Sequence, residues 1–364
     1  MNRKFRQAVF FLLAAGTAWL IFARPELCTV SLREGLQLCG GPLLVSLLPF
    51  LIVSSLAVRS GAGETLGILF CPAARLIGIR GSGARSAGGV LLIGFLGGFA
   101  PAASAVRDAV QTGRLTARQA SALLPACICS GPSFVVLTVG GQLLGSRALG
   151  VRLFAAQLLA GYLTAALLGR LHRCEEPEIT ANAPEEPLPG LDELIAQATV
   201  AYLKLCGFVL YFRLLAAGCG QILPGRLAVL PAMLLEVCSG CDYAARTGLW
   251  ASSLCCTALS LQGASVLLQV RTLCPPEVSL RPLLAARLVH LPLSLALFWL
   301  GWPEQTAEAF STLSGRIVTM QRVPLDCALL AFAVCCMTAW EAARLAFCQK
   351  AGTVKSGLDR KSEI

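Results

Sequence analysis

The sequence predicts an all-α polytopic membrane protein with about 8–10 membrane segments, each near the length that crosses a bilayer. Hydrophobic residues make up 56% of the 364 residues and charged residues only 14%. In soluble domains roughly half of the residues are apolar and about a quarter are charged. The mean hydropathy is +0.71. Apolar runs recur from Gln7 to Cys348, so no stretch is left for a separate soluble core.

The first apolar run, residues 7–23, follows three basic residues and predicts a retained helix. The same layout describes a signal peptide, but no small-x-small cleavage site precedes Arg24. We therefore expect residues 1–41 to form an N-terminal transmembrane anchor and connector, with the N-terminus in the cytoplasm.

Further apolar runs follow along the chain. Seven have nearly the length of a spanning helix, at 42–58, 120–143, 148–169, 197–218, 249–270, 281–302 and 325–348. Two others, 88–104 and 227–244, are interrupted by glycine and proline. They predict broken or re-entrant helices, which membranes tolerate where protein or a water-filled cavity satisfies the freed backbone.

The acidic, proline-rich stretch 170–196 predicts a linker that divides two membrane repeats, 42–169 and 197–302. Each repeat has a spanning helix, a broken segment, a helix with a glycine-small-serine break, and then "AAQL" or "AARL". Residues 303–364 would supply a connector, a last transmembrane helix and a basic tail. We expect the repeats to be related by inversion.

The two breaks, "CSGPSFVVL" (129–137) and "LQGASVLLQ" (261–269), interrupt apolar runs. Inverted repeats with interrupted helices are typical of secondary transporters, whose substrates bind at the repeat interface. The alternative is a packing site, because small residues let helices approach closely. If the breaks form a binding site, its residues are Ser130, Gly131, Pro132, Ser133, Gly263 and Ser265.

Charged residues inside apolar runs are costly and need an explanation. Glu236, with nearby Ser239, could hold a coupling proton or Na⁺, and Arg287 could bind a substrate carboxylate. Alternatively, Glu236 and Arg287 pair with each other. The other charged residues are interpreted as snorkelling to the interface or pairing locally; they are Lys204, Arg213, Glu341 and Arg344.

Several other functions are disfavoured. The chain has 30 lysines and arginines against 20 aspartates and glutamates. The basic residues lie in short segments between apolar runs, as orientation signals do, so their excess does not indicate nucleic-acid binding. The Cys238-x-x-Cys241 pair has no partner pair at zinc spacing, so we expect no metal and no cofactor. Hydrolase and phosphate-loop motifs are missing, which argues against an enzyme.

The positions of the arginines predict the orientation. If segments 88–104 and 227–244 are re-entrant, both termini are cytoplasmic, and so are seven arginines of the first half. These arginines are Arg59, Arg75, Arg80, Arg85, Arg107, Arg114 and Arg118.

Three stretches resemble one known family. "GFLGGFAPAAS" (94–104), "TGRLTARQASALLPACICSGPSF" (112–134) and "LLEVCSG" (234–240) are similar to motifs of the sporulation integral membrane protein YlbJ family, within the group that carries the nucleoside-recognition Gate domain. The resemblance covers about residues 40–302. It implies a bacterial membrane protein that moves dipicolinic acid from the mother cell across the outer forespore membrane.

One departure from that family concerns the substrate. Where the family has a tyrosine-proline pair and a downstream lysine, this chain has Phe99-Ala100-Pro101 and Ser104. Arg107, one turn further on, could replace the missing cation.

We therefore predict that the protein is a secondary transporter of a small anionic metabolite and that it is in contact with membrane lipid. Dipicolinate is the first candidate substrate. The alternatives are a nucleoside or nucleobase permease, which would use Gln157 and Gln262 as intramembrane amides, or a sporulation scaffold that docks partners on the acidic linker. The oligomeric state stays open.

Overall fold

The computed structural model describes residues 3–59, 62–81, 83–171, 190–223, 227 and 229–300, and every regular element within them is a helix. The last predicted helix, 325–348, lies outside the described residues with Glu341 and Arg344. Most of the predicted acidic linker lies outside them too.

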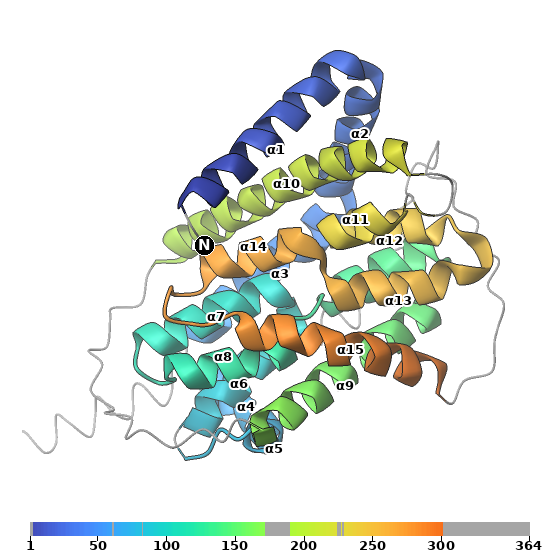
Figure 1. The fold of residues 1–364 in the computed structure, drawn as a ribbon. Helices are drawn as coiled ribbons and strands as arrows, with labels where there is room; N and C mark the ends of the chain where they lie inside the picture. The colour runs from blue at the N-terminus through green and yellow to red at the C-terminus, as the bar shows by residue number, and fades with distance from the viewer. Residues whose placement is uncertain are drawn as a thin grey trace, which may run out of the picture.

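Most of the helices are joined to the next by short connections (Figure 1). They are α1 (Arg3–Ala23), α2 (Pro25–Leu38), η1 (Cys39–Leu43), α3 (Leu44–Arg59), α4 (Ala62–Gly67), η2 (Ile68–Phe70), α5 (Cys71–Leu76), α6 (Gly83–Gly97), α7 (Phe99–Gln111), α8 (Ala117–Cys127), η3 (Ser133–Leu143), α9 (Arg147–Leu171), α10 (Leu191–Ile222), α11 (Val229–Leu235), α12 (Val237–Ala245), η5 (Gly248–Trp250), α13 (Ala251–Leu261), α14 (Gly263–Leu273) and α15 (Arg281–Trp299).

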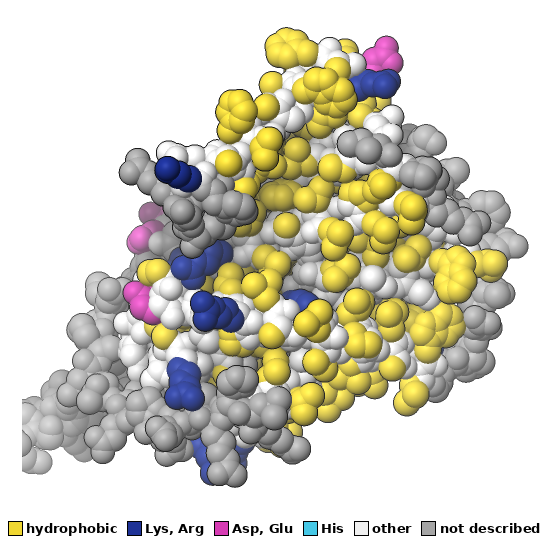
Figure 2. Space-filling view, viewed as in Figure 1, with side chains coloured by type: hydrophobic (Ala, Val, Ile, Leu, Met, Phe, Trp, Pro, Cys, Tyr) yellow, Lys and Arg dark blue, Asp and Glu magenta, His cyan; other side chains and the backbone are white. Residues whose placement is uncertain are grey.

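The all-α membrane class is confirmed. In the described part, four helical stretches are long and apolar enough to cross a bilayer, at Arg147–Gly169, Leu191–Gln221, Gly248–Leu273 and Arg281–Trp299. A fifth is possible if α1 and α2, bent by 107°, count as one span. Exposed hydrophobic side chains cover the middle of the molecule (Figure 2). Such an extensive apolar surface is a surface for lipid.

The run 120–143 is divided at its predicted break, where the non-helical stretch 128–131 separates α8 from η3. One feature differs from the prediction, the set of short helices α2, α4 and α5, which the sequence did not predict because they lack a long apolar window.

The two irregular runs form helical hairpins, as expected for re-entrant segments. In the first, α6 and α7 meet at Gly98, and in the second, α11 and α12 meet at Glu236. Each hairpin begins and ends at one end of the helix bundle, and the two enter from opposite ends (Figure 1). Their tips therefore face each other in the middle of the molecule.

The two glycine-small-serine motifs both interrupt a helix. Between α8 and η3, Pro132 lacks an N–H and disfavours helical geometry at Gly131, which explains the break. Between α13 and α14, Gln262 and Gly263 are both left-handed, with φ of 60° and 69°. A left-handed pair cannot continue a right-handed helix.

Each hairpin tip packs against the break of its own repeat. A Cβ built at Gly98 would lie 2.6 Å from the backbone nitrogen of Gly131. In the second repeat, a Cβ built at Gly263 would lie 2.8 Å from the backbone nitrogen of Glu236. Only glycine permits such an approach, so the two halves repeat one packing arrangement with the orientation inverted.

Candidate functional site

A small cavity lies where both hairpin tips meet the first helix break. Its walls come from the two tips, the α8–η3 break, α3, α10 and α14. The lining residues are Leu43, Leu47, Leu51, Gly97, Phe99, Ala100, Pro101, Ser130, Gly131, Phe134, Leu205, Val209, Glu236, Val237, Cys238, Val266 and Gln269.

The cavity combines apolar walls with a few oxygen-bearing groups. Its polar side chains come from Ser130, Glu236 and Gln269, and no lysine or arginine is among the described residues that line it. About 30 Å³ of it is open to the centre of a water molecule. That is room for one or two waters.

Glu236 is fixed at the tip of the second hairpin. Its backbone is extended, with φ −152° and ψ 126°, and its carboxylate accepts from the N–H groups of Cys238 at 2.9 Å and Ser239 at 2.6 Å. The carboxylate therefore caps the positive N-terminal end of α12. Only 2% of Glu236 is exposed.

Ser130 is a buried hydroxyl without a hydrogen-bond partner in the described structure. It lines the cavity just before η3, whose N-terminus has no side-chain cap, and close to the uncapped N-terminus of α7. The first N–H groups of a helix have no partner within the helix. The hydroxyl and these two helix ends therefore form one group of hydrogen-bond donors beside the cavity.

Arg287 joins the breaks of the two repeats and does not line the cavity. From α15 it donates to the carbonyl of Ile128 at 3.0 Å, at the end of α8, and to that of Ser260 at 3.2 Å, near the end of α13. It also donates to Gln262 Oε1 at 2.8 Å, and Gln262 donates to Ile128. A cation at these carbonyls stabilises the negative ends of two half-helices.

Gln157 makes the corresponding contact from the first repeat. It lies in α9, and its amide donates across the repeat boundary to the carbonyl of Cys256 at 3.0 Å and to Ser260 Oγ at 2.9 Å. His290 Nε2 lies 3.0 Å from the carbonyl of Gln157. The matched positions in "AAQL" and "AARL" therefore hold the two repeats together.

The pairing of Glu236 with Arg287, considered as an alternative, does not occur, because both side chains are hydrogen-bonded elsewhere. Of the predicted site residues, the structure brings three together at the cavity: Ser130, Gly131 and Glu236. Eight do not line it, namely Ser104, Arg107, Pro132, Ser133, Ser239, Gly263, Ser265 and Arg287.

The positions of those residues explain their separation from the cavity. Arg107 lies two turns along α7 from the tip and pairs with Asp108 at 3.2 Å. Ser265 accepts from the Gln269 amide at 3.0 Å, and Gln269 in turn reaches the cavity. Sequence reasoning missed Gln269 because it lies at the end of its apolar run, although its i,i+4 spacing from Ser265 could have indicated it.

Cys238 and Cys241 are buried free thiols. Among the described residues, no group of three or more His, Cys, Asp and Glu side chains could hold a metal ion.

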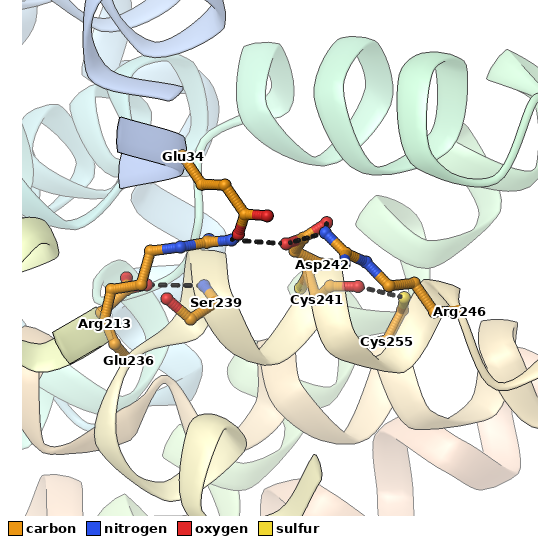
Figure 3. Close-up of polar contacts among 8 residues, drawn as sticks. All are labelled: Glu34, Arg213, Glu236, Ser239, Cys241, Asp242, Arg246 and Cys255. Carbon is orange, nitrogen blue, oxygen red and sulfur yellow. Dashed lines mark hydrogen bonds and ion pairs between the residues drawn. The ribbon is translucent and has the colours of Figure 1, made fainter. Parts of the chain in front are cut away.

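Arg213 does not snorkel, contrary to the sequence interpretation. Only 3% of its side chain is exposed, and it binds Glu34 of α2 at 2.5 Å and Asp242 of α12 at 2.8 Å (Figure 3). Arg246 also binds Asp242, at 2.7 Å. The network links the second hairpin to α2 and α10. Lys204, by contrast, is exposed, as expected for a snorkelling residue.

This network gives a stability prediction. Arg213→Ala should destabilise the protein by about 3–5 kcal/mol, because Glu34 and the buried Asp242 both lose an ion-pair partner. Asp242 then keeps only Arg246. Arg246→Ala is the matched control and should cost at most about 1 kcal/mol, since Arg246 is 37% exposed. Thermal unfolding of the purified variants in detergent measures both. Equal effects would contradict the structural role of Arg213.

No family model, curated protein or solved structure matches this chain.

Proposed function

We propose that this protein is a secondary transporter that moves a small carboxylate anion across a bacterial membrane through the cavity between the hairpin tips. Two inverted hairpins and two broken helices that meet near the middle of a membrane domain support this mechanism, because transporters place substrates at such breaks.

The observation that carries the proposal concerns Ser130, a residue that is 6% exposed. Its buried hydroxyl has no partner in the described structure and lies beside two uncapped half-helix N-termini. A carboxylate could accept from this hydroxyl and from the first N–H groups of α7 and η3. Helix N-termini attract anions because their N–H groups and dipole both point at the ligand.

Dipicolinate is the first candidate substrate. Its two carboxylates are held rigidly on one ring. The resemblance to the YlbJ family also implies dipicolinate as the substrate. A space of about 30 Å³ is far too small for it. The cavity must therefore widen to hold dipicolinate, and we infer that the hairpin tips move apart to admit the substrate.

The basic residues support an orientation. Dark-blue side chains gather along the left of the molecule, at the end where the α7–α8 and α14–α15 connections lie (Figure 2). The exposed arginines in these two connections or in the adjoining helix ends are Arg114, Arg118, Arg271 and Arg281. We propose that this end faces the cytoplasm, which also places the N-terminus there.

A neutral nucleoside or nucleobase is the second candidate. The apolar walls, the amide of Gln269 and the absence of lysine or arginine among the described lining residues favour an uncharged ring.

Flux measurements distinguish these substrates. Liposomes containing the purified protein are loaded with dipicolinate and a neutral nucleoside together, and the release of each is compared with release from protein-free liposomes. Faster release of dipicolinate alone supports the anion transporter. Selective release of the nucleoside, or no release of either from folded protein, would contradict it.

A further inference from the structure

The cavity wall carries a negative charge that would repel an anionic substrate. Glu236 places a carboxylate in its wall, and none of the described residues that line it is a lysine or arginine. If the proposed function holds, a carboxylate substrate would face a like charge across a few ångströms of poorly solvated space. Such repulsion is strong where water is scarce.

The same wall presents oxygen atoms suited to a cation. Glu236 contributes its carboxylate, and Ser130 contributes a hydroxyl oxygen that no other described group uses. Gln269 donates from its amide nitrogen to Ser265, and its side-chain carbonyl can supply a further oxygen to the cavity. Gly97, also in the wall, is the last residue of α6 and brings the negative end of a half-helix.

We propose that this cavity binds Na⁺ through Ser130, Glu236 and Gln269, and that this ion is the coupling ion of transport. One monovalent cation neutralises the single carboxylate, and hard cations prefer oxygen ligands. The small volume has room for one compact ion such as Na⁺ together with one water molecule. The ion would then face the carboxylate substrate held by α7 and η3.

Ser130 makes the site testable without transport. A buried hydroxyl without a partner is costly, so Ser130→Ala should leave the thermal midpoint in Na⁺-free buffer unchanged or raised. The same variant loses an ion ligand, so its response to Na⁺ should fall. A role in packing alone would move the midpoint in both buffers equally.

The experiment measures the thermal midpoint of the purified full-length protein in detergent, with NaCl, KCl or choline chloride at equal ionic strength and no dicarboxylate. Saturating Na⁺ should raise the wild-type midpoint by about 3–6 °C above choline, because an ion that binds only the folded state stabilises it. K⁺ should give less than half of this rise.

The variants define the site. Glu236→Gln and Ser130→Ala should each lose at least half of the Na⁺ response. The controls are Glu277→Gln, an exposed acid, and Ser253→Ala, which removes another unpartnered hydroxyl away from the cavity. Both controls should keep the full response.

An equal rise with all three salts, or a full response in Ser130→Ala, would overturn the proposal. If Glu236→Gln does not fold, Ser130→Ala still decides. A Na⁺ response without dicarboxylate flux would refute the proposed function and not the ion site. Flux without a Na⁺ response would refute the ion site alone.

Discussion

Gly263→Ala should destabilise the protein by about 2–5 kcal/mol. The left-handed φ of 69° costs an alanine about 1–2 kcal/mol. The overlap of the new Cβ with the backbone of Leu235 and Glu236 adds about 1–3 kcal/mol, because the hairpin tip must shift.

A matched control separates these two effects. Gly248 has nearly the same φ, 70°, but a Cβ there would meet nothing within 4 Å. Gly248→Ala should therefore show the backbone cost alone. Gly98 and Gly113 form the same kind of pair in the first repeat, with φ of 82° and 68°. If Gly98→Ala and Gly263→Ala unfold at the same temperatures as their controls, the close packing of tip against break is wrong.

Arg287→Ala should cost about 3–5 kcal/mol, because three buried acceptors at the two helix breaks lose their charged donor. The loss should appear as a lower thermal midpoint in Na⁺-free and Na⁺-containing buffer alike, since Arg287 does not line the cavity.

Two further variants test whether the effect is specific to the guanidinium group of Arg287. Arg281→Ala removes an exposed arginine from the start of the same helix and should be close to neutral. Arg287→Lys keeps the charge but lacks the planar fork, so it should recover only part of the stability. If Arg287→Ala is as stable as Arg281→Ala while dicarboxylate binding disappears, Arg287 is a substrate ligand and the structural role is wrong.

The helices were largely predictable from the sequence because their signals are local. The apolar run 7–23 corresponds to α1, and the interruptions in 88–104 and 227–244 correspond to the two hairpin tips. Gly131 and Gly263 also lie at breaks, as their motifs indicated. Glycine and proline act on their own backbone, so they mark such places without knowledge of the fold.

The contacts of the buried charged residues could not be predicted from the sequence in the same way. Arg287 and Arg213 were both recognised as costly, but the sequence does not state whether a buried cation faces a substrate, a carboxylate or a carbonyl. Arg213 finds Asp242 29 residues away and Glu34 179 residues away. Such contacts depend on how the helices pack. The composition of the cavity wall depends on the same packing.

The central claim is that the transported anion passes through the cavity between the hairpin tips, and Ser130 tests it most directly. The initial rate of dipicolinate release from liposomes should be compared for the wild type, Ser130→Ala and Ser253→Ala, with equal amounts of folded protein. Both substitutions remove an unpartnered buried hydroxyl, but only Ser130 lines this cavity. Loss of a hydrogen bond to a charged group should slow Ser130→Ala by about tenfold or more and leave Ser253→Ala near the wild-type rate. Equal rates for all three proteins would contradict the claim.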